Sequence, residues 1–114
     1  MIYDTTVTVY HKEGDRITRR VLTGCHLEMG ESLTLDKGQA NWERDFFLVI
    51  PLDRPVAGGD KIWVGIGPKI TAEQWQSFIP AQYPQLLVAR QVRAYSLGGR
   101  IHHYEVSRKR RYLD

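Results

Sequence analysis

The sequence predicts a mainly β protein, a small antiparallel β-barrel or sandwich with one long loop and one short helix. Two apolar runs occupy 45–52 and 61–66, and the first is rich in aromatic and branched side chains, as in a strand buried on both faces. Stretches that alternate polar and apolar residues flank this pair, and turns that contain glycine separate them. We interpret the two runs as the central strands that supply the core.

The chain of 114 residues is long enough for one domain that buries a core without disulfides or metal ions. We expect a single barrel-like domain over 1–107, followed by a basic C-terminal tail over 108–114. Charged residues make up 25% and hydrophobic residues 42%, a balance that excludes wholesale disorder. No apolar run approaches the roughly 18 residues of a membrane helix. Residues 1–6 lack the pattern of a secretory signal.

The N-terminal part predicts a hairpin. Residues 5–11 alternate, with threonines and Tyr10 on one face and valines on the other, which is typical of a half-buried strand. A charged turn that contains Gly14 leads to a return strand over 17–23. Gly24 is expected to bend that strand, so that 25–29 continues in a new direction, as at the corner of a small barrel.

Residues 30–44 show no sustained hydrophobic period. A connection of this length inside a compact domain is usually functional or disordered. We expect it to protrude, with a weak strand at 32–35. Trp42 is either an anchor of an interface, where aromatic residues concentrate, or a side chain tucked under the loop.

The C-terminal half predicts a short helix and a second hairpin. Thr71 and Gln74 fit a capping box, and 71–78 predicts about two helical turns that prolines then end. Residues 86–95 and 100–107 predict two strands around a Gly98-Gly99 turn, because glycine supplies the positive φ of tight turns. Trp63 is interpreted as a core residue rather than an interface residue.

Catalytic and metal-binding patterns are weak. His102 and His103 are neighbours in a predicted strand and should point to opposite faces, so we expect no shared metal ion. Cys25 cannot form an internal disulfide, and we interpret it as a small buried residue rather than a reactive thiol. A hydrolase built on Cys25 and His26 is the weakest of the hypotheses. We therefore expect a protein that is not an enzyme and binds no cofactor.

The charge is unevenly distributed along the chain. Residues 1–60 carry a net charge of −3 and residues 61–114 carry +6. Such a two-signed surface suits head-to-tail self-association. An alternative is a small nucleic-acid-binding barrel, in which the basic residues contact phosphates and the interleaved tyrosines stack on bases. These residues are Arg90, Arg93, Arg100, Arg108, Lys109, Arg110 and Arg111, with Tyr95, Tyr104 and Tyr112.

The order of elements resembles a known family. A first hairpin with a corner at Gly24, a long loop, a strand that begins Gly58-Gly59-Asp60-Lys61-Ile62 and a closing hairpin that ends Tyr104-Glu105-Val106-Ser107 follow one another. In this order the chain resembles the head–tail connectors (stopper or head–tail joining proteins) and minor capsid proteins of tailed phages, as encoded in prophages of Gram-positive bacteria. The segment 71–84 departs from the order in those proteins.

The resemblance implies a structural virion protein that forms a homo-oligomeric ring between a portal or adaptor and the tail, assembled in the cytoplasm of the bacterial host. It implies other phage structural proteins as partners, with packaged DNA as a further candidate, and neither a membrane nor a small-molecule substrate. Interface residues are then expected in the long loop and the tail. They are Leu33, Leu35, Trp42, Arg108, Lys109, Arg110, Arg111 and Tyr112.

Overall fold

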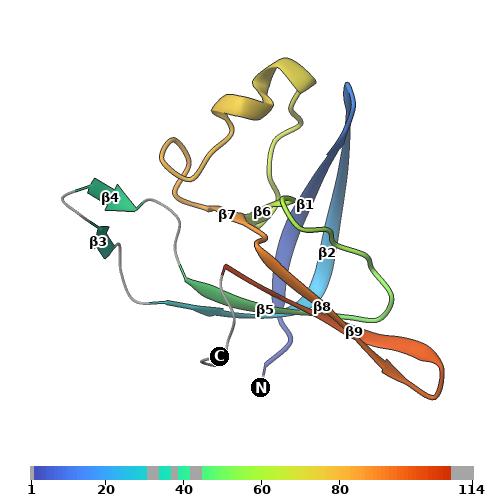
Figure 1. Cartoon of the computed structure of the whole chain (residues 1–114). Coiled ribbons are helices and arrows are strands. Elements are labelled where there is room, and N and C mark those ends of the chain that lie inside the picture. The colour runs from blue at the N-terminus through green and yellow to red at the C-terminus, as the bar shows by residue number, and fades with distance from the viewer. Residues whose placement is uncertain (1, 31–33, 37–38, 42–44, 109–114) are drawn as a thin grey trace.

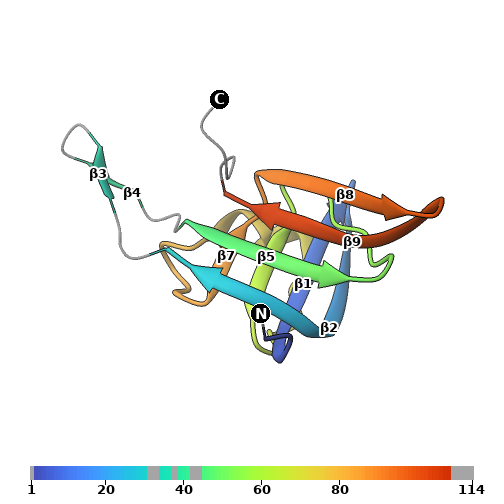
Figure 2. The same cartoon turned by 90° about the horizontal axis from the view of Figure 1, so that it is seen from below.

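The computed structural model describes residues 2–30, 34–36, 39–41 and 45–108. Within them, seven strands form one antiparallel sheet in the order β7-β6-β1-β2-β5-β9-β8, and β3 pairs with β4 in a separate two-stranded sheet. The large sheet curls into a half-barrel (Figures 1 and 2), which confirms the predicted class. The elements are β1 (Thr5–Glu13), β2 (Arg16–Met29), β3 (Thr34–Asp36), β4 (Gln39–Asn41), β5 (Phe46–Pro51), β6 (Lys61–Val64), the 3₁₀ helix η1 (Ala72–Ser77), β7 (Leu86–Val88), β8 (Gln91–Leu97) and β9 (Arg100–Ser107).

Strand β2 joins the two halves of the sheet. Its first half pairs with β1, and its last residues pair with β5, beginning at His26 opposite Val49. The β1–β2 register shifts at a bulge between these two stretches, where Gly24 has φ +72°. A bulge of this kind bends a strand and increases its twist. The predicted corner at Gly24 is confirmed.

The two apolar runs form interior strands that do not pair with each other. Strand β5 lies between β2 and β9, and β6 lies between β1 and β7. β6 ends at Val64, earlier than predicted, because the chain turns at Gly65, which has φ +102°. The amide of Gly65 still donates to the carbonyl of Thr6 over 2.8 Å, one position beyond the last β1–β6 pair, Val7 with Val64.

The single strand predicted over 86–95 is wrong, because this segment forms two strands at opposite edges of the sheet. β7 pairs with β6, and β8 pairs with β9. Between them, the Ala89 amide donates to the Asp60 carbonyl over 2.9 Å, and the Gly59 amide donates to the Ala89 carbonyl over 2.6 Å. These bonds hold the crossover where the two edges of the curled sheet come together.

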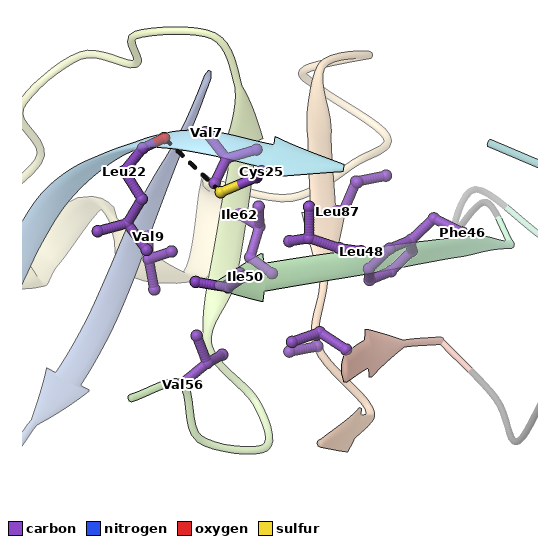
Figure 3. Packing of buried hydrophobic residues seen from close by; sticks show 12 residues of the cluster. Val7, Val9, Leu22, Cys25, Phe46, Leu48, Ile50, Val56, Ile62 and Leu87 are labelled. Atoms are coloured by element: carbon purple, nitrogen blue, oxygen red, sulfur yellow. Dashed lines mark hydrogen bonds between the residues drawn. The ribbon is translucent and has the colours of Figure 1, made fainter. Parts of the chain in front are cut away.

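The inner face of the curled sheet holds the main core (Figure 3). Cys25 is completely buried among these side chains, which confirms its interpretation as a small core residue. Burying each Val, Leu or Ile side chain contributes about 1.5–3 kcal/mol to folding. The buried cluster is Val7, Val9, Leu22, Cys25, Phe46, Leu48, Ile50, Val56, Ile62, Leu87, Ala89 and Val106.

A second cluster covers the other face of β1, so the prediction of a half-buried strand is wrong. Tyr10 is fully buried beneath Phe78, whose ring meets it edge-on with centroids 4.8 Å apart. Trp63 stacks on Phe78 with centroids 5.8 Å apart, in agreement with its predicted place in the core. The segment after β6 crosses this face of the sheet, and periodicity within β1 carries no information about that crossing.

The predicted helix is a short 3₁₀ helix, η1. The Thr71 amide donates to Oε1 of Gln74 over 2.9 Å, which is one half of the predicted capping box. Lys61 attaches η1 to the sheet, because its buried ammonium group donates to the Trp75 carbonyl over 2.5 Å and lies 4.2 Å from the centre of the Trp75 ring. Burial, together with the charge of Arg90, lowers the pKa of Lys61.

Candidate interaction surfaces

The long loop is closed at its base. The Gly30 amide donates to the Asp45 carbonyl over 2.6 Å, directly beyond the last β2–β5 pair, Met29 with Phe46. Gly30 is suited to this approach, because a Cβ atom added there would lie 2.6 Å from Cβ of Asp45. Strands β2 and β5 therefore come together at residues 30 and 45, which form the base of the loop.

Within this loop the structure describes a small hairpin. β3 pairs with β4 through Thr34 with Asn41, Leu35 with Ala40 and Asp36 with Gln39. Figures 1 and 2 show the pair standing away from the curled sheet. The predicted weak strand at 32–35 corresponds to β3, and the predicted interface residue Leu35 lies in it. Leu33 and Trp42 lie outside the described residues.

The tail begins beside the base of the loop. The Arg108 guanidinium donates to Oδ1 of Asp45 over 2.8 Å, and the Arg108 side chain is 22% exposed. This neighbourhood follows from the β5–β9 register, which places Ser107 opposite Phe47. The structure thus places the start of the tail beside the base of the long loop, and these are the two segments predicted to form interfaces. Lys109, Arg110, Arg111 and Tyr112 lie outside the described residues.

A second projection is the β8–β9 hairpin. The β5–β9 ladder ends where Pro51 meets His103, and one further bond joins the Leu52 amide to the His102 carbonyl. The tip extends past the body of the sheet (Figure 2). It turns through Gly98 and Gly99, both at positive φ as the turn prediction requires. Leu97 at the tip is 71% exposed, a feature that the sequence analysis did not identify.

The aromatic residues of this hairpin are engaged within the chain. Tyr95 stacks on His103, with centroids 4.8 Å apart and planes within 6°. The Tyr104 hydroxyl donates to Oδ1 of Asp53 over 3.0 Å. Burial, followed by that hydrogen bond and the charge of Asp53, raises the pKa of Tyr104. A base would have to displace His103 from one face of Tyr95, and a phosphate near Tyr104 would meet a carboxylate, so these contacts disfavour stacking on single strands.

A histidine–aspartate pair lies near the turn of the β1–β2 hairpin, where the end of β1 pairs with the start of β2. The His11 imidazole donates from Nδ1 to Oδ1 of Asp60 over 2.6 Å, and Oδ2 accepts from the Ala57 amide over 2.9 Å. Asp60 is buried, whereas the side chain of His11 is 37% exposed. The hydrogen bond to Asp60 and its charge raise the pKa of His11. The pair fixes the 55–60 loop onto β1.

The residues around Cys25 do not form a catalytic arrangement. Burial raises the pKa of the Cys25 thiol and so disfavours the thiolate. His26 directs Nδ1 to the Ile2 carbonyl at 2.7 Å and Nε2 to the Glu28 carboxylate at 2.9 Å.

Two hollows lie on the surface, one of about 760 Å³ near η1 and one of about 310 Å³ near His11. Among the described residues, no three His, Cys, Asp or Glu side chains converge in a way that would hold a metal ion.

The expected divergence of His102 and His103 is wrong. Their Nδ1 atoms lie 2.9 Å apart. The β8–β9 register shifts between Tyr95, which faces His103, and Ser96, which faces Ile101. His102 is therefore the extra residue of a bulge, and strict alternation of side chains fails there.

Comparisons with protein-family models, curated proteins and solved structures give no match. Across the part of the chain that the structure describes, no helix is long and apolar enough to cross a membrane.

Proposed function

We propose that this protein is a structural assembly subunit without enzymatic activity, of the kind found in phage head–tail connectors and minor capsids, and that it forms a ring through its projecting segments. The observation that carries the proposal is the closed base of the long loop. Because Gly30 and Asp45 already meet, a two-residue turn could connect β2 with β5 in place of residues 31–44. A hairpin that contributes nothing to closing the sheet is available to contact other subunits.

The placement of the tail supports the same proposal. Arg108 pairs with Asp45, so the basic tail starts beside the base of the loop. The β8–β9 tip presents Leu97 elsewhere on the surface. Two different projecting surfaces on one subunit favour heterologous contacts, which close into rings when the rotation between neighbours allows it. The uneven charge of the two halves of the sequence suits such head-to-tail contacts.

The sharpest test replaces residues 31–44 by Asn-Gly. This dipeptide favours the two-residue turn that joins antiparallel strands, and Gly30 and Asp45 would flank it. We expect the intact protein to form closed oligomers in sedimentation velocity and electron microscopy. The variant with Asn-Gly in place of 31–44 should keep the circular dichroism spectrum of the intact protein and remain monomeric. An intact chain that stays monomeric, or a replaced chain that assembles equally well, contradicts the proposal.

A matched pair of substitutions tests the second surface. Leu97→Asp places a charge at the β8–β9 tip, and Ile66→Asp places one at a residue that is equally exposed, at 73% against 71%. We expect Leu97→Asp to weaken assembly and Ile66→Asp to leave it unchanged. Equal effects of the two substitutions would show that the tip makes no specific contact.

The tail is tested by two truncations. Removal of 109–114 keeps the Arg108–Asp45 ion pair, whereas removal of 108–114 loses it. Both proteins should fold, and both should assemble more weakly than the intact chain. Unaltered assembly in both would refute a docking role for the tail. Steeply salt-dependent binding of single-stranded nucleic acid by the intact chain, lost in both truncations, would favour the alternative of a nucleic-acid-binding barrel.

A further inference from the structure

The bulge in β9 forms a pair of imidazoles that alternation along a strand would forbid. His102 has no partner in the β8–β9 register, since Tyr95 faces His103 and Ser96 faces Ile101. The extra residue turns the His102 ring toward that of its neighbour. The ring centroids are 5.2 Å apart, the planes are nearly perpendicular at 83°, and the two Nδ1 atoms are 2.9 Å apart.

The surroundings of His103 hold its ring in one orientation. Its Nε2 atom lies 3.1 Å from Oε2 of Glu105, so Nε2–H donates to this carboxylate. Tyr95 stacks on the ring, with centroids 4.8 Å apart. A proton on Nε2 leaves the lone pair of the neutral imidazole on Nδ1, which faces His102. Carboxylates that accept from the distal nitrogen in this way orient the histidine ligands of metal sites and raise their basicity.

We propose that His102 and His103 form a two-nitrogen site for a divalent first-row transition-metal ion, with Cu²⁺ preferred. Imidazole nitrogens bind such ions at about 2.0 Å, so nitrogens 2.9 Å apart subtend an angle of about 90° at the ion. That angle fits two adjacent positions of a square-planar or tetragonal ion such as Cu²⁺ or Ni²⁺. A tetrahedral zinc ion needs its nitrogen ligands about 3.3 Å apart. Water fills the other positions.

The site is accessible from solvent. The His102 side chain is exposed, and His103 retains 21% of its side-chain exposure. The ion replaces the hydrogen bond between the two Nδ1 atoms. The proton on Nδ1 of His102 then moves to Nε2 of the same ring. The ion lies off the line between the two Nδ1 atoms, so both rings rotate about their Cβ–Cγ bonds until their lone pairs point at it. The bond between His103 and Glu105 stays in place and acts as the outer support of the site.

The test is a titration of the full-length protein with Cu²⁺ and with Zn²⁺. Calorimetry monitors both titrations, and visible absorption and electron paramagnetic resonance monitor the copper titration. We expect one Cu²⁺ ion per chain, a spectrum with two nitrogen ligands from imidazole, and weaker binding of Zn²⁺. His102→Ala and His103→Ala should each weaken Cu²⁺ binding by more than the roughly tenfold that loss of an outer support costs. Glu105→Gln should weaken it less, because this residue positions a ligand and does not bind the ion.

His26→Ala is the matched control. His26 also lies on a strand with a carboxylate at one nitrogen, but it has no second imidazole beside it. Its substitution should leave Cu²⁺ affinity unchanged. Copper binding of equal affinity in the His102→Ala/His103→Ala double variant, or no binding by the intact chain, overturns the proposal. Circular dichroism spectra of all variants identify any loss of fold.

Discussion

The amide of Gly67 donates to Oγ1 of Thr8 over 2.9 Å, and the same hydroxyl donates to the Gly65 carbonyl over 2.8 Å. One threonine of β1 thus satisfies a donor and an acceptor of the segment that follows β6. Arg19 adds hydrogen bonds from its guanidinium to the Gly67 carbonyl, and the Tyr10 hydroxyl donates to the Pro68 carbonyl over 2.6 Å. These bonds hold an irregular segment over the face of β1 that the sequence predicted to be exposed.

Thr8→Val should lower the free energy of unfolding by about 1–3 kcal/mol. The substitution keeps the shape of the side chain but leaves the buried Gly67 amide and the Gly65 carbonyl without their partner. Urea denaturation measures the change. Thr18→Val, at an exposed position of β2, is the control and should change stability by less than about 0.5 kcal/mol. Equal effects of the two substitutions would refute the role of the Thr8 hydroxyl.

Gly67→Ala should destabilise the protein by about 1–3 kcal/mol through overpacking. The added methyl group would overlap the Tyr10 hydroxyl and lie 2.7 Å from Cγ of Trp63. Gly58→Ala is the control, since a methyl group there meets no atom within 4 Å. Thermal unfolding of the two variants, compared with the parent protein, gives the difference. A Gly67→Ala protein as stable as Gly58→Ala would show that the segment around Gly67 accommodates the methyl group without a loss of stability.

Stability should fall as the pH rises above about 6.5. The folded chain raises the pKa of His11, first through the hydrogen bond to Asp60 and then through its charge. The stabilisation is therefore complete below the pKa of the unfolded state and is lost as the pH passes through the higher pKa of the folded state. His26 contributes with the same sign, because Glu28 raises its pKa too.

Urea denaturation between pH 5 and 8.5 measures this dependence, and nuclear magnetic resonance titration identifies the pKa of each ring. His11→Asn should flatten the part of the profile that His11 causes and leave the His26 part. A His11 ring in the folded protein that titrates below 6.5 would contradict the expected direction.

The Cys25 thiol should react with a thiol reagent only when the protein unfolds. It is completely buried, and burial raises its pKa, so both access and the thiolate form are lacking in the folded state. The rate of labelling in urea should follow the fraction of unfolded protein. Fast labelling of the folded chain would point instead to an opening of the β2 corner next to Gly24.

The sequence was most informative where local patterns decide the structure. The apolar run of β5, the turns at Gly14 and Gly98-Gly99, and the corner at Gly24 all follow from hydrophobicity and backbone freedom. It was least informative where distant segments meet. The cover over β1 depends on contacts of Thr8 and Tyr10 with residues almost sixty positions later. The split at Ala89 depends on bonds to Asp60.

The candidate sites show the same contrast between features set by local sequence and features set by contacts between distant segments. Residues 30–44 stood out because they lack a hydrophobic period, but the meeting of Arg108 with Asp45 depends on the pairing of β5 with β9. Strict alternation along β9 predicts that the two imidazoles point to opposite faces. One displaced residue in the β8–β9 register reverses that inference, and no local signal around His102 marks the bulge.

The contact between Gly30 and Asp45 also determines how this fold can diversify. Since the two residues close the sheet by themselves, the sequence inserted between them can change in length and composition while the barrel keeps its register. The surface that this segment presents can therefore change while the scaffold stays stable. The same position offers an engineer a site for grafting a foreign peptide epitope onto a folded carrier.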